Sequence, residues 1–160
     1  MKTEPQEEHI WLQKLVGEWT YETDCSSGPD QPPVKLQGSE SVRSFGDLWI
    51  LAEGRGEMRG GGTGLTLLTL GHDPQKQRYV GTWIGSMMAH LWLYDGELEP
   101  AGNALTLHAE GPGMSATPKR VKYKDVIEFQ GPGHRIFTSH ALGDDGRWQQ
   151  FMTVHYRRKK

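Results

Sequence analysis

The sequence predicts an all-β protein: an up-and-down antiparallel β-barrel of about ten strands, with one short N-terminal helix that caps an end. Three observations support this fold class. Apolar residues occur at helical spacing in only one segment, near the N-terminus. The rest of the 160-residue chain alternates short extended runs with turn signals, and 21 of its residues are glycine. Six tryptophans, five tyrosines and four phenylalanines supply core side chains that a disordered chain would lack.

The predicted helix covers residues 5–16. Thr3 and Gln6 have the spacing of a capping box, in which each side chain satisfies a backbone N–H at the helix start. Gly17 follows as a natural C-terminal stop. The apolar face of this helix consists of Trp11, Leu12, Leu15 and Val16.

Ten extended runs follow the helix, with turn sequences such as Gly143-Asp144-Asp145-Gly146 between them. The runs span residues 17–25, 34–45, 48–58, 64–71, 77–86, 89–98, 104–110, 121–129, 134–142 and 147–158. Because an open sheet of this size would expose edges that aggregate, we expect the strands to close into a barrel over residues 17–158. The whole chain, residues 1–160, is expected to form a single domain. Such a barrel encloses a cavity that side chains only partly fill.

The composition excludes several function classes. The formal net charge is -2 and both signs are interspersed, which does not suit a nucleic-acid partner. One cysteine, Cys25, excludes an internal disulfide and a cysteine-based zinc site. No apolar run approaches the ~20 residues that span a bilayer, so we expect no membrane partner. The polar N-terminus does not look like a secretion signal, and the expected location is the cytoplasm.

A short motif then points to a superfamily. Gly17-Glu18-Trp19, directly after the helix, resembles the signature at the start of the first strand in calycins. That group includes lipocalins, fatty-acid-binding proteins and haem-binding nitrobindins. The resemblance implies that Trp19 packs at the closed end of the barrel under an arginine of the last strand, either Arg157 or Arg158. An arginine over an indole ring contributes about 0.5–2 kcal/mol.

A closer resemblance covers nearly the whole chain. It rests on the segments His9-Ile10-Trp11-Leu12, Gly17-Glu18-Trp19, Arg43-Ser44-Phe45-Gly46-Asp47-Leu48-Trp49, Thr69-Leu70-Gly71-His72-Asp73 and Tyr79-Val80-Gly81-Thr82-Trp83. These segments resemble an uncharacterised bacterial family, domain of unknown function 1579, which is grouped with the calycins. The resemblance implies a lipocalin-like barrel and no reaction. One departure is Gly85, where members often carry an acidic residue.

The segment 83–94 is the richest in aromatic and thioether groups. Methionines adapt their shape and aromatic rings stack, so this segment is either a ligand-binding wall or plain hydrophobic core. If residues 99–103 form a turn, this strand shares an apolar face with Leu105 and Leu107, which we expect to point inward. The cavity candidates from this segment are Trp83, Met87, His90, Trp92 and Tyr94.

Two histidines on neighbouring predicted strands, His140 and His155, are further cavity candidates. With a turn between residues 145 and 146 they share a face, but His155 lies opposite Ile136. Four residues along a strand span about 13 Å, too far for two ligands of one zinc ion. No metal site is therefore expected.

Glu53 and Arg43 complete the candidates. Glu53 is either a polar anchor inside the barrel with Arg43 as its partner, or half of an exposed ion pair on the outside. The sequence leaves both interpretations open.

The leading functional hypothesis is a non-enzymatic binder of a small, mainly apolar molecule in the barrel cavity. Two alternatives stay open: haem-linked chemistry at a single cavity histidine, and an enzyme that uses His140, His155 or Glu53 as acid or base. There is no nucleophile elbow or phosphate loop, so no catalytic residue is assigned. No histidine has a recognisable axial-ligand motif, and no cofactor is expected. The chain is expected to be a monomer or a homodimer.

Overall fold

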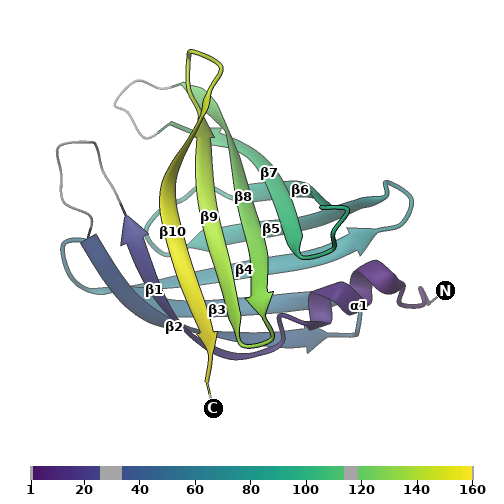
Figure 1. Ribbon diagram of the computed structural model, residues 1–160. Coiled ribbons are helices and arrows are strands. Elements are labelled where there is room, and N and C mark those ends of the chain that lie inside the picture. The colour runs from purple at the N-terminus through teal and green to yellow at the C-terminus, as the bar shows by residue number, and fades with distance from the viewer. Residues whose placement is uncertain (1, 26–33, 114–118, 160) are drawn as a thin grey trace.

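A computed structural model describes residues 2–25, 34–113 and 119–159, and its ten antiparallel strands close into a barrel (Figure 1). The strands are β1 (Gly17–Cys25), β2 (Val34–Phe45), β3 (Trp49–Glu57), β4 (Thr63–Asp73), β5 (Arg78–Gly85), β6 (Trp92–Leu98), β7 (Ala104–Pro112), β8 (Arg120–Gly131), β9 (His134–Leu142) and β10 (Trp148–Arg158). Each strand pairs with its neighbours in sequence, and β1 pairs with β10 to close the ring. The predicted all-β up-and-down barrel is confirmed.

The strand that starts latest relative to its prediction is β6, which begins at Trp92 rather than at residue 89. The preceding loop is held against β4. The Ser86 amide donates to the Leu65 carbonyl at 2.8 Å, and the Leu65 amide donates to Ser86 Oγ at 2.9 Å. Met88 then donates to the Gly85 carbonyl in a tight turn. These bonds direct the chain away from a regular strand until Trp92.

The helix α1 (Glu7–Gln13) is shorter than predicted. Its N-terminal cap is Gln6 rather than Thr3, and the capping box joins Gln6 to His9. A start at Thr3 would place Glu4 in the first turn, and a residue before proline is disfavoured in the helical region. After Gln13 the backbone bonds run from residue i to residue i−3, so the chain tightens and leaves the helix.

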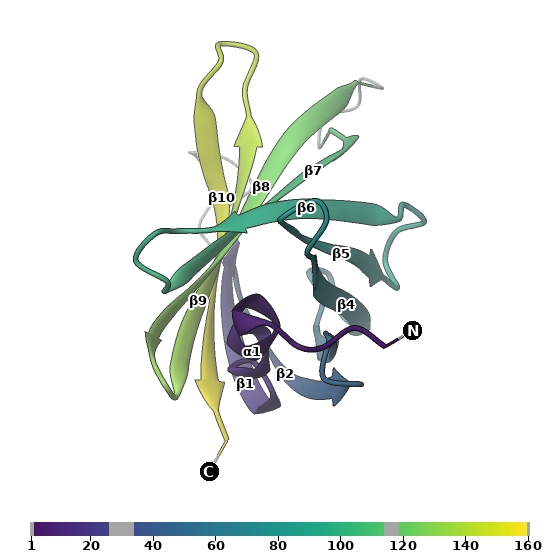
Figure 2. The same cartoon turned by 90° about the vertical axis from the view of Figure 1, so that its right-hand side faces the viewer.

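One end of the barrel is filled by side chains and covered by α1. The helix contacts β3 and β4 and lies across this end (Figure 2). Trp11 Nε1 donates to the Gly102 carbonyl at 2.7 Å, which ties the helix to the turn between β6 and β7. The fully buried side chains at this end include Leu12, Trp19, Ile50 and Leu70. This end is the closed end.

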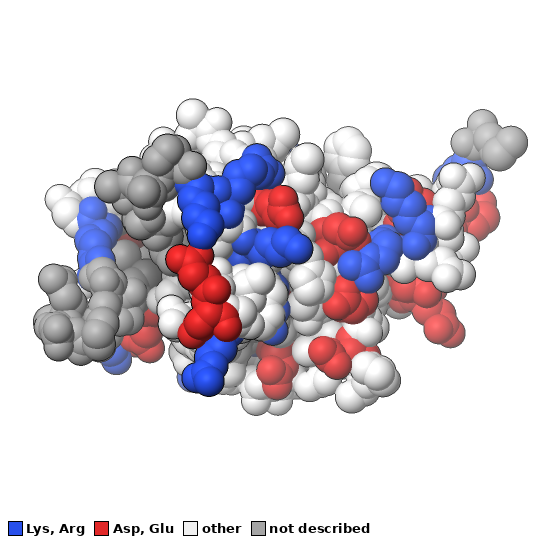
Figure 3. All heavy atoms as spheres, turned by 90° about the horizontal axis from the view of Figure 1, so that it is seen from above, with Lys and Arg blue, Asp and Glu red and all other residues white. Residues whose placement is uncertain are grey.

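Figure 3 shows the molecule from above relative to Figure 1, and acidic and basic side chains are interspersed on the face that it shows. Within the described part of the chain, no helix is both long enough and apolar enough to cross a membrane.

Candidate functional site

The barrel encloses a cavity of about 850 Å³ on the side away from α1. Every strand except β3 contributes to its wall. Much of the lining is aromatic or thioether: Tyr21, Trp83, Met87, Met88, Trp92, Tyr94, Tyr123, Phe137, Phe151, Met152 and Tyr156. The volume falls within the range of about 300–1,000 Å³ that is usual for small-molecule sites.

Two glycines make room for one of these rings. A Cβ atom on Gly38 would lie 2.2 Å from Cζ of Tyr21, and one on Gly56 would lie 1.8 Å from the Tyr21 hydroxyl. The ring therefore lies over the backbone of β2 and β3, where larger residues would push it into the cavity. It meets the Tyr156 ring at a centroid distance of 5.4 Å. The result is an aromatic wall that leaves the centre of the cavity open.

A buried ion pair lies at the inner end of the cavity. Arg135 Nη2 on β9 donates to Glu40 Oε1 on β2, and the two side chains are only 4% and 9% exposed. The guanidinium carbon lies 3.8 Å from the centre of the Tyr156 ring and 4.6 Å from that of Trp19. Burial, with the charge of Glu40, raises the pKa of Tyr156 well above its usual value. This end of the cavity is thus polar but electrically balanced.

Asp125 faces the cavity from β8. Its carboxylate accepts hydrogen bonds from the hydroxyls of Tyr94 on β6 and Ser139, its direct partner on β9. Burial raises the pKa of this carboxyl above its usual value. It forms no salt bridge with any lysine, arginine or histidine that the structure describes. Asp125 is therefore a buried carboxyl held by neutral donors.

His90 lies at the rim of the cavity, just before β6. Its ring meets Trp92 edge-on at 4.6 Å, and Trp92 in turn meets Tyr123 at 5.2 Å. A Cβ atom on Gly111 would lie 2.9 Å from His90 Nε2, and this nitrogen is buried with no hydrogen-bond partner among the described residues. The nitrogen therefore packs against the β7 backbone instead of presenting a free lone pair to the cavity.

The structure brings one group of sequence-predicted residues together at the cavity. These residues are Trp83, Met87, His90, Trp92 and Tyr94. Strand alternation explains the placement of Trp92 and Tyr94, since residues two apart share a face.

His140 and His155 lie outside the cavity, contrary to the expectation. On β9 the inward residue is Ser139, and on β10 it is Val154, so each histidine takes the opposite face. His155 stacks on His134 with ring centroids 5.5 Å apart. Neither candidate histidine is placed to act on a molecule in the cavity.

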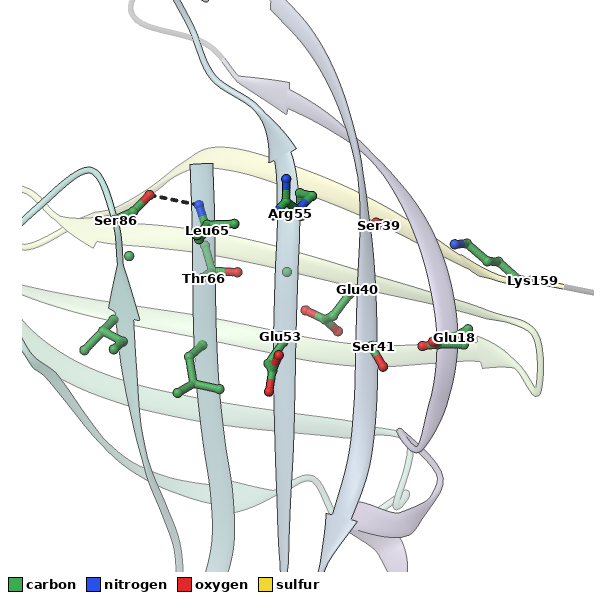
Figure 4. A pocket seen from close by; sticks show the side chains of 14 residues that line it. Glu18, Ser39, Glu40, Ser41, Glu53, Arg55, Leu65, Thr66, Ser86 and Lys159 are labelled. Atoms are coloured by element: carbon green, nitrogen blue, oxygen red, sulfur yellow. Dashed lines mark hydrogen bonds between the residues drawn. The ribbon is translucent and has the colours of Figure 1, made fainter. Parts of the chain in front are cut away.

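Glu53 and Arg43 also lie on the outer surface. Arg43 Nη2 is 3.7 Å from Glu53 Oε1, and the side chains are 59% and 62% exposed. The inner face of β3 carries Ala52 and Gly54 instead. Glu53 lines an outer groove of about 650 Å³ together with Arg55 on the same strand (Figure 4). Because both side chains are exposed to water, this ion pair contributes little to the stability of the fold.

The structure distinguishes the two candidate arginines at the closed end. Trp19 is fully buried, and the guanidinium carbon of Arg158 lies 4.2 Å from the centre of its ring. Arg157 pairs with Thr20 and is exposed. Neighbouring residues of a strand face opposite sides, so only one of the two can stack on the indole.

Sequence reasoning missed the acidic and basic residues of the cavity, Glu40, Asp125 and Arg135, together with Ser139 and several aromatic residues, among them Tyr123, Phe137 and Tyr156. Tyr123, Asp125 and Ile127 are two residues apart, so the alternation of a strand puts them on one face of β8. What the sequence lacked was the register that would show this face to be the inner one.

The comparisons with known proteins concern the whole chain. The family model described as "Protein of unknown function (DUF1579)" matches residues 4–158. A search of curated proteins found no match to the sequence.

Solved structures with the same fold share little sequence with this chain. Rv2717c from M. tuberculosis has a TM-score of 0.68 and 11% identity, over 98% of this chain and 100% of that one. The S-type phycobiliprotein lyase CPES from Guillardia theta has a TM-score of 0.59 and 16% identity, over 98% and 99%. EF1p2_mFAP2b, solved bound to DFHBI, has a TM-score of 0.51 and 14% identity, over 96% and 100%. At these identities the likeness shows the fold alone.

Proposed function

This chain belongs to the DUF1579 family, and we propose that it binds a small, mainly apolar, ring-containing molecule inside the barrel. The observation that carries the proposal is the open cavity of about 850 Å³ with its aromatic and thioether wall. Protein interiors are normally close-packed, and an empty apolar space lowers stability. A fold that retains such a space at one end while packing the other supports a binding role for the open end.

The fold comparisons support the same class of function. One barrel with this fold has been solved with the small molecule DFHBI bound, and another is a phycobiliprotein lyase. Aromatic walls favour flat ligands because ring faces stack on one another. Methionines at the rim, Met87 and Met88, adapt to the outline of different ligands.

The residues considered for the two alternatives are not placed to support them. His140, His155 and Glu53 lie on the outer surface, so they cannot act as acid or base on a molecule in the cavity. A haem-binding role would need a free imidazole nitrogen in the cavity, whereas His90 Nε2 packs against Gly111. Binding without a haem cofactor remains our prediction. We likewise keep a cytoplasmic monomer or homodimer, with no nucleic-acid or membrane partner, as expectations of this proposal.

The test uses N-phenyl-1-naphthylamine, a neutral apolar fluorophore, titrated into the full chain. We expect a saturable rise and blue shift of its emission. Leu68→Trp fills the cavity from the inner face of β4, and we expect it to weaken binding by about tenfold or more. Leu67→Trp is the matched control, because the adjacent side chain lies on the outer face, and its affinity should stay within about twofold of wild type. Absence of saturable binding, or equal affinities of both variants, would contradict the proposal.

A further inference from the structure

The charges that line the cavity do not balance. Among the described residues, three side chains that can carry a full charge line it: Glu40, Arg135 and Asp125. Glu40 and Arg135 neutralise each other in a direct ion pair. Asp125 is left with hydroxyl donors only. An ionised Asp125 therefore makes the lining of the cavity net negative.

A carboxylate in this position still has capacity for a ligand. Its two oxygens offer about four acceptor positions, of which the Tyr94 and Ser139 hydroxyls occupy two. Asp125 also keeps part of its surface accessible, and this surface faces the cavity. The two hydroxyls orient the carboxylate, because they come from different strands. Ser139 lies on the neighbouring strand β9, and Tyr94 lies on β6.

Aromatic rings surround this carboxyl. Tyr123 is two residues away on the same face of β8, and Phe137 lies diagonally across the β8–β9 pair, opposite Ile127. Tyr94 contacts the carboxyl directly. Ring faces attract cations through their quadrupole, and the attraction grows where water is excluded. A carboxylate among aromatic rings is an arrangement that favours a positively charged organic group over a neutral or anionic one.

An unpaired charge in a low-dielectric cavity is unfavourable, and burial accordingly raises the pKa of the Asp125 carboxyl. A ligand cation removes this penalty by pairing with the ionised form. An anionic ligand would increase it, since Arg135, the only cationic side chain that the described part of the chain contributes to the lining, is already paired with Glu40.

We propose that the molecule bound in the cavity is an organic cation, such as a protonated aromatic or alkyl-aromatic amine, whose charged group pairs with Asp125. This inference rests on the proposed function and names the chemical class of its ligand. The apolar part of the ligand lies against the rings of the wall, and its ammonium group lies at the β8–β9 face.

The test compares three probes that share one ring system: 1-naphthylmethylamine, 1-naphthalenemethanol and 1-naphthoic acid, which are cationic, neutral and anionic at neutral pH. Each competes with N-phenyl-1-naphthylamine for the full chain. We expect the cation to bind about tenfold or more tightly than the alcohol, and the acid to bind most weakly. Asp125→Asn should weaken the cation about tenfold and leave the alcohol within about twofold. The matched control is Glu128→Gln, which removes an outward carboxylate of the same strand and should preserve the preference.

The comparison of the three probes on the wild-type chain needs no variant, so it tests the proposed ligand class even if Asp125→Asn fails to fold. If the alcohol or the acid binds as tightly as the amine, the proposed ligand class is wrong while the binding function stands. A folded Asp125→Asn protein that keeps the preference for the amine also overturns it. If neither the fluorophore nor any of the three probes binds, the proposed function itself is wrong.

Discussion

Arg158 and Trp19 face each other across the β1–β10 pair, with the guanidinium carbon 4.2 Å from the centre of the indole ring. The same guanidinium donates to the carbonyls of Val16 at 2.7 Å and Lys14 at 3.0 Å, just after α1. Trp19 Nε1 donates to the Leu15 carbonyl at 2.9 Å. The last strand of the barrel is thereby tied both to the first strand and to the segment that follows the helix.

Replacement of Trp19 by alanine should be strongly destabilising. The side chain is fully buried, so Trp19→Ala leaves a large cavity at the closed end and should lower the free energy of unfolding by about 3–5 kcal/mol. Urea denaturation followed by far-UV circular dichroism measures this loss. Trp148→Ala is the control, since Trp148 is 39% exposed, and its effect should be clearly smaller than that of Trp19→Ala. A similar loss in both variants would contradict this account of the closed end.

The two C-terminal arginines should differ in their effect on stability. Arg158→Ala removes the stacking on Trp19 and the hydrogen bonds to the carbonyls of Lys14 and Val16. We expect a loss of about 2 kcal/mol. Arg157→Ala changes an exposed side chain and should cost less than about 0.5 kcal/mol. Thermal unfolding of the two variants side by side makes the comparison, and equal shifts in Tm would speak against it.

The buried pair of Glu40 and Arg135 should respond differently to single and double substitution. Glu40→Gln leaves the buried guanidinium without its counter-charge, and we expect a loss of about 3–5 kcal/mol. Arg135→Met likewise leaves the buried Glu40 carboxylate without its counter-charge. Once both charges are gone the desolvation penalty is gone too, so Glu40→Gln/Arg135→Met should recover much of the loss. A double-mutant cycle from urea denaturation measures the coupling. Additive losses would show that the two charges do not stabilise each other.

Protonation of His72 should destabilise the protein in mild acid. Burial lowers the pKa of His72 from 6.5, against the opposing charge of Glu8. Below about 6.5 the unfolded chain binds a proton that the folded chain does not, so the free energy of unfolding falls as the pH drops towards the folded-state pKa. His72→Phe keeps a ring beside Tyr79 and removes this titration. Between about pH 7.5 and pH 5.5 the wild type should lose more stability than His72→Phe in urea denaturation. The prediction fails if the two lose equal amounts.

Asp125 should have the opposite pH dependence. Its folded-state pKa is raised above 3.8, mainly by burial, so the folded chain binds the proton more tightly than the unfolded chain. This contribution to stability is present at low pH and is lost as the pH rises through the folded-state pKa. Without ligand, Asp125→Asn should therefore be more stable than wild type at neutral pH and should lose this gain in acid. Differential scanning calorimetry of both proteins, from neutral pH into acid, measures the gain in stability and its loss. If Asp125→Asn is less stable than wild type at neutral pH, the conclusion that an ionised Asp125 destabilises the folded protein is wrong.

Local signals in the sequence were sufficient for the architecture. Alternation within each run and the turn residues between runs predict ten strands, and the structure has ten in the same order. The helix was less well predicted at its ends, because proline and the tightening of the last turn act through backbone geometry that apolar spacing does not report. The segment 83–94 was identified from its composition, since aromatic and thioether groups concentrate there in the sequence itself.

The polar half of the cavity was decided by the tertiary structure. Glu40 and Arg135 are separated by 95 residues in the chain and lie on strands that become near neighbours only when β1 pairs with β10. A charged side chain on a strand indicates an outward face until its partner is known, so nothing local in the sequence distinguishes Arg135 and Asp125, which face the cavity, from Glu53, which does not. The sequence by itself determined the strands and the aromatic segment 83–94, because those depend on neighbours along the chain. Closure of the barrel determined which carboxylates face inward, because that depends on the register between strands that are distant in sequence.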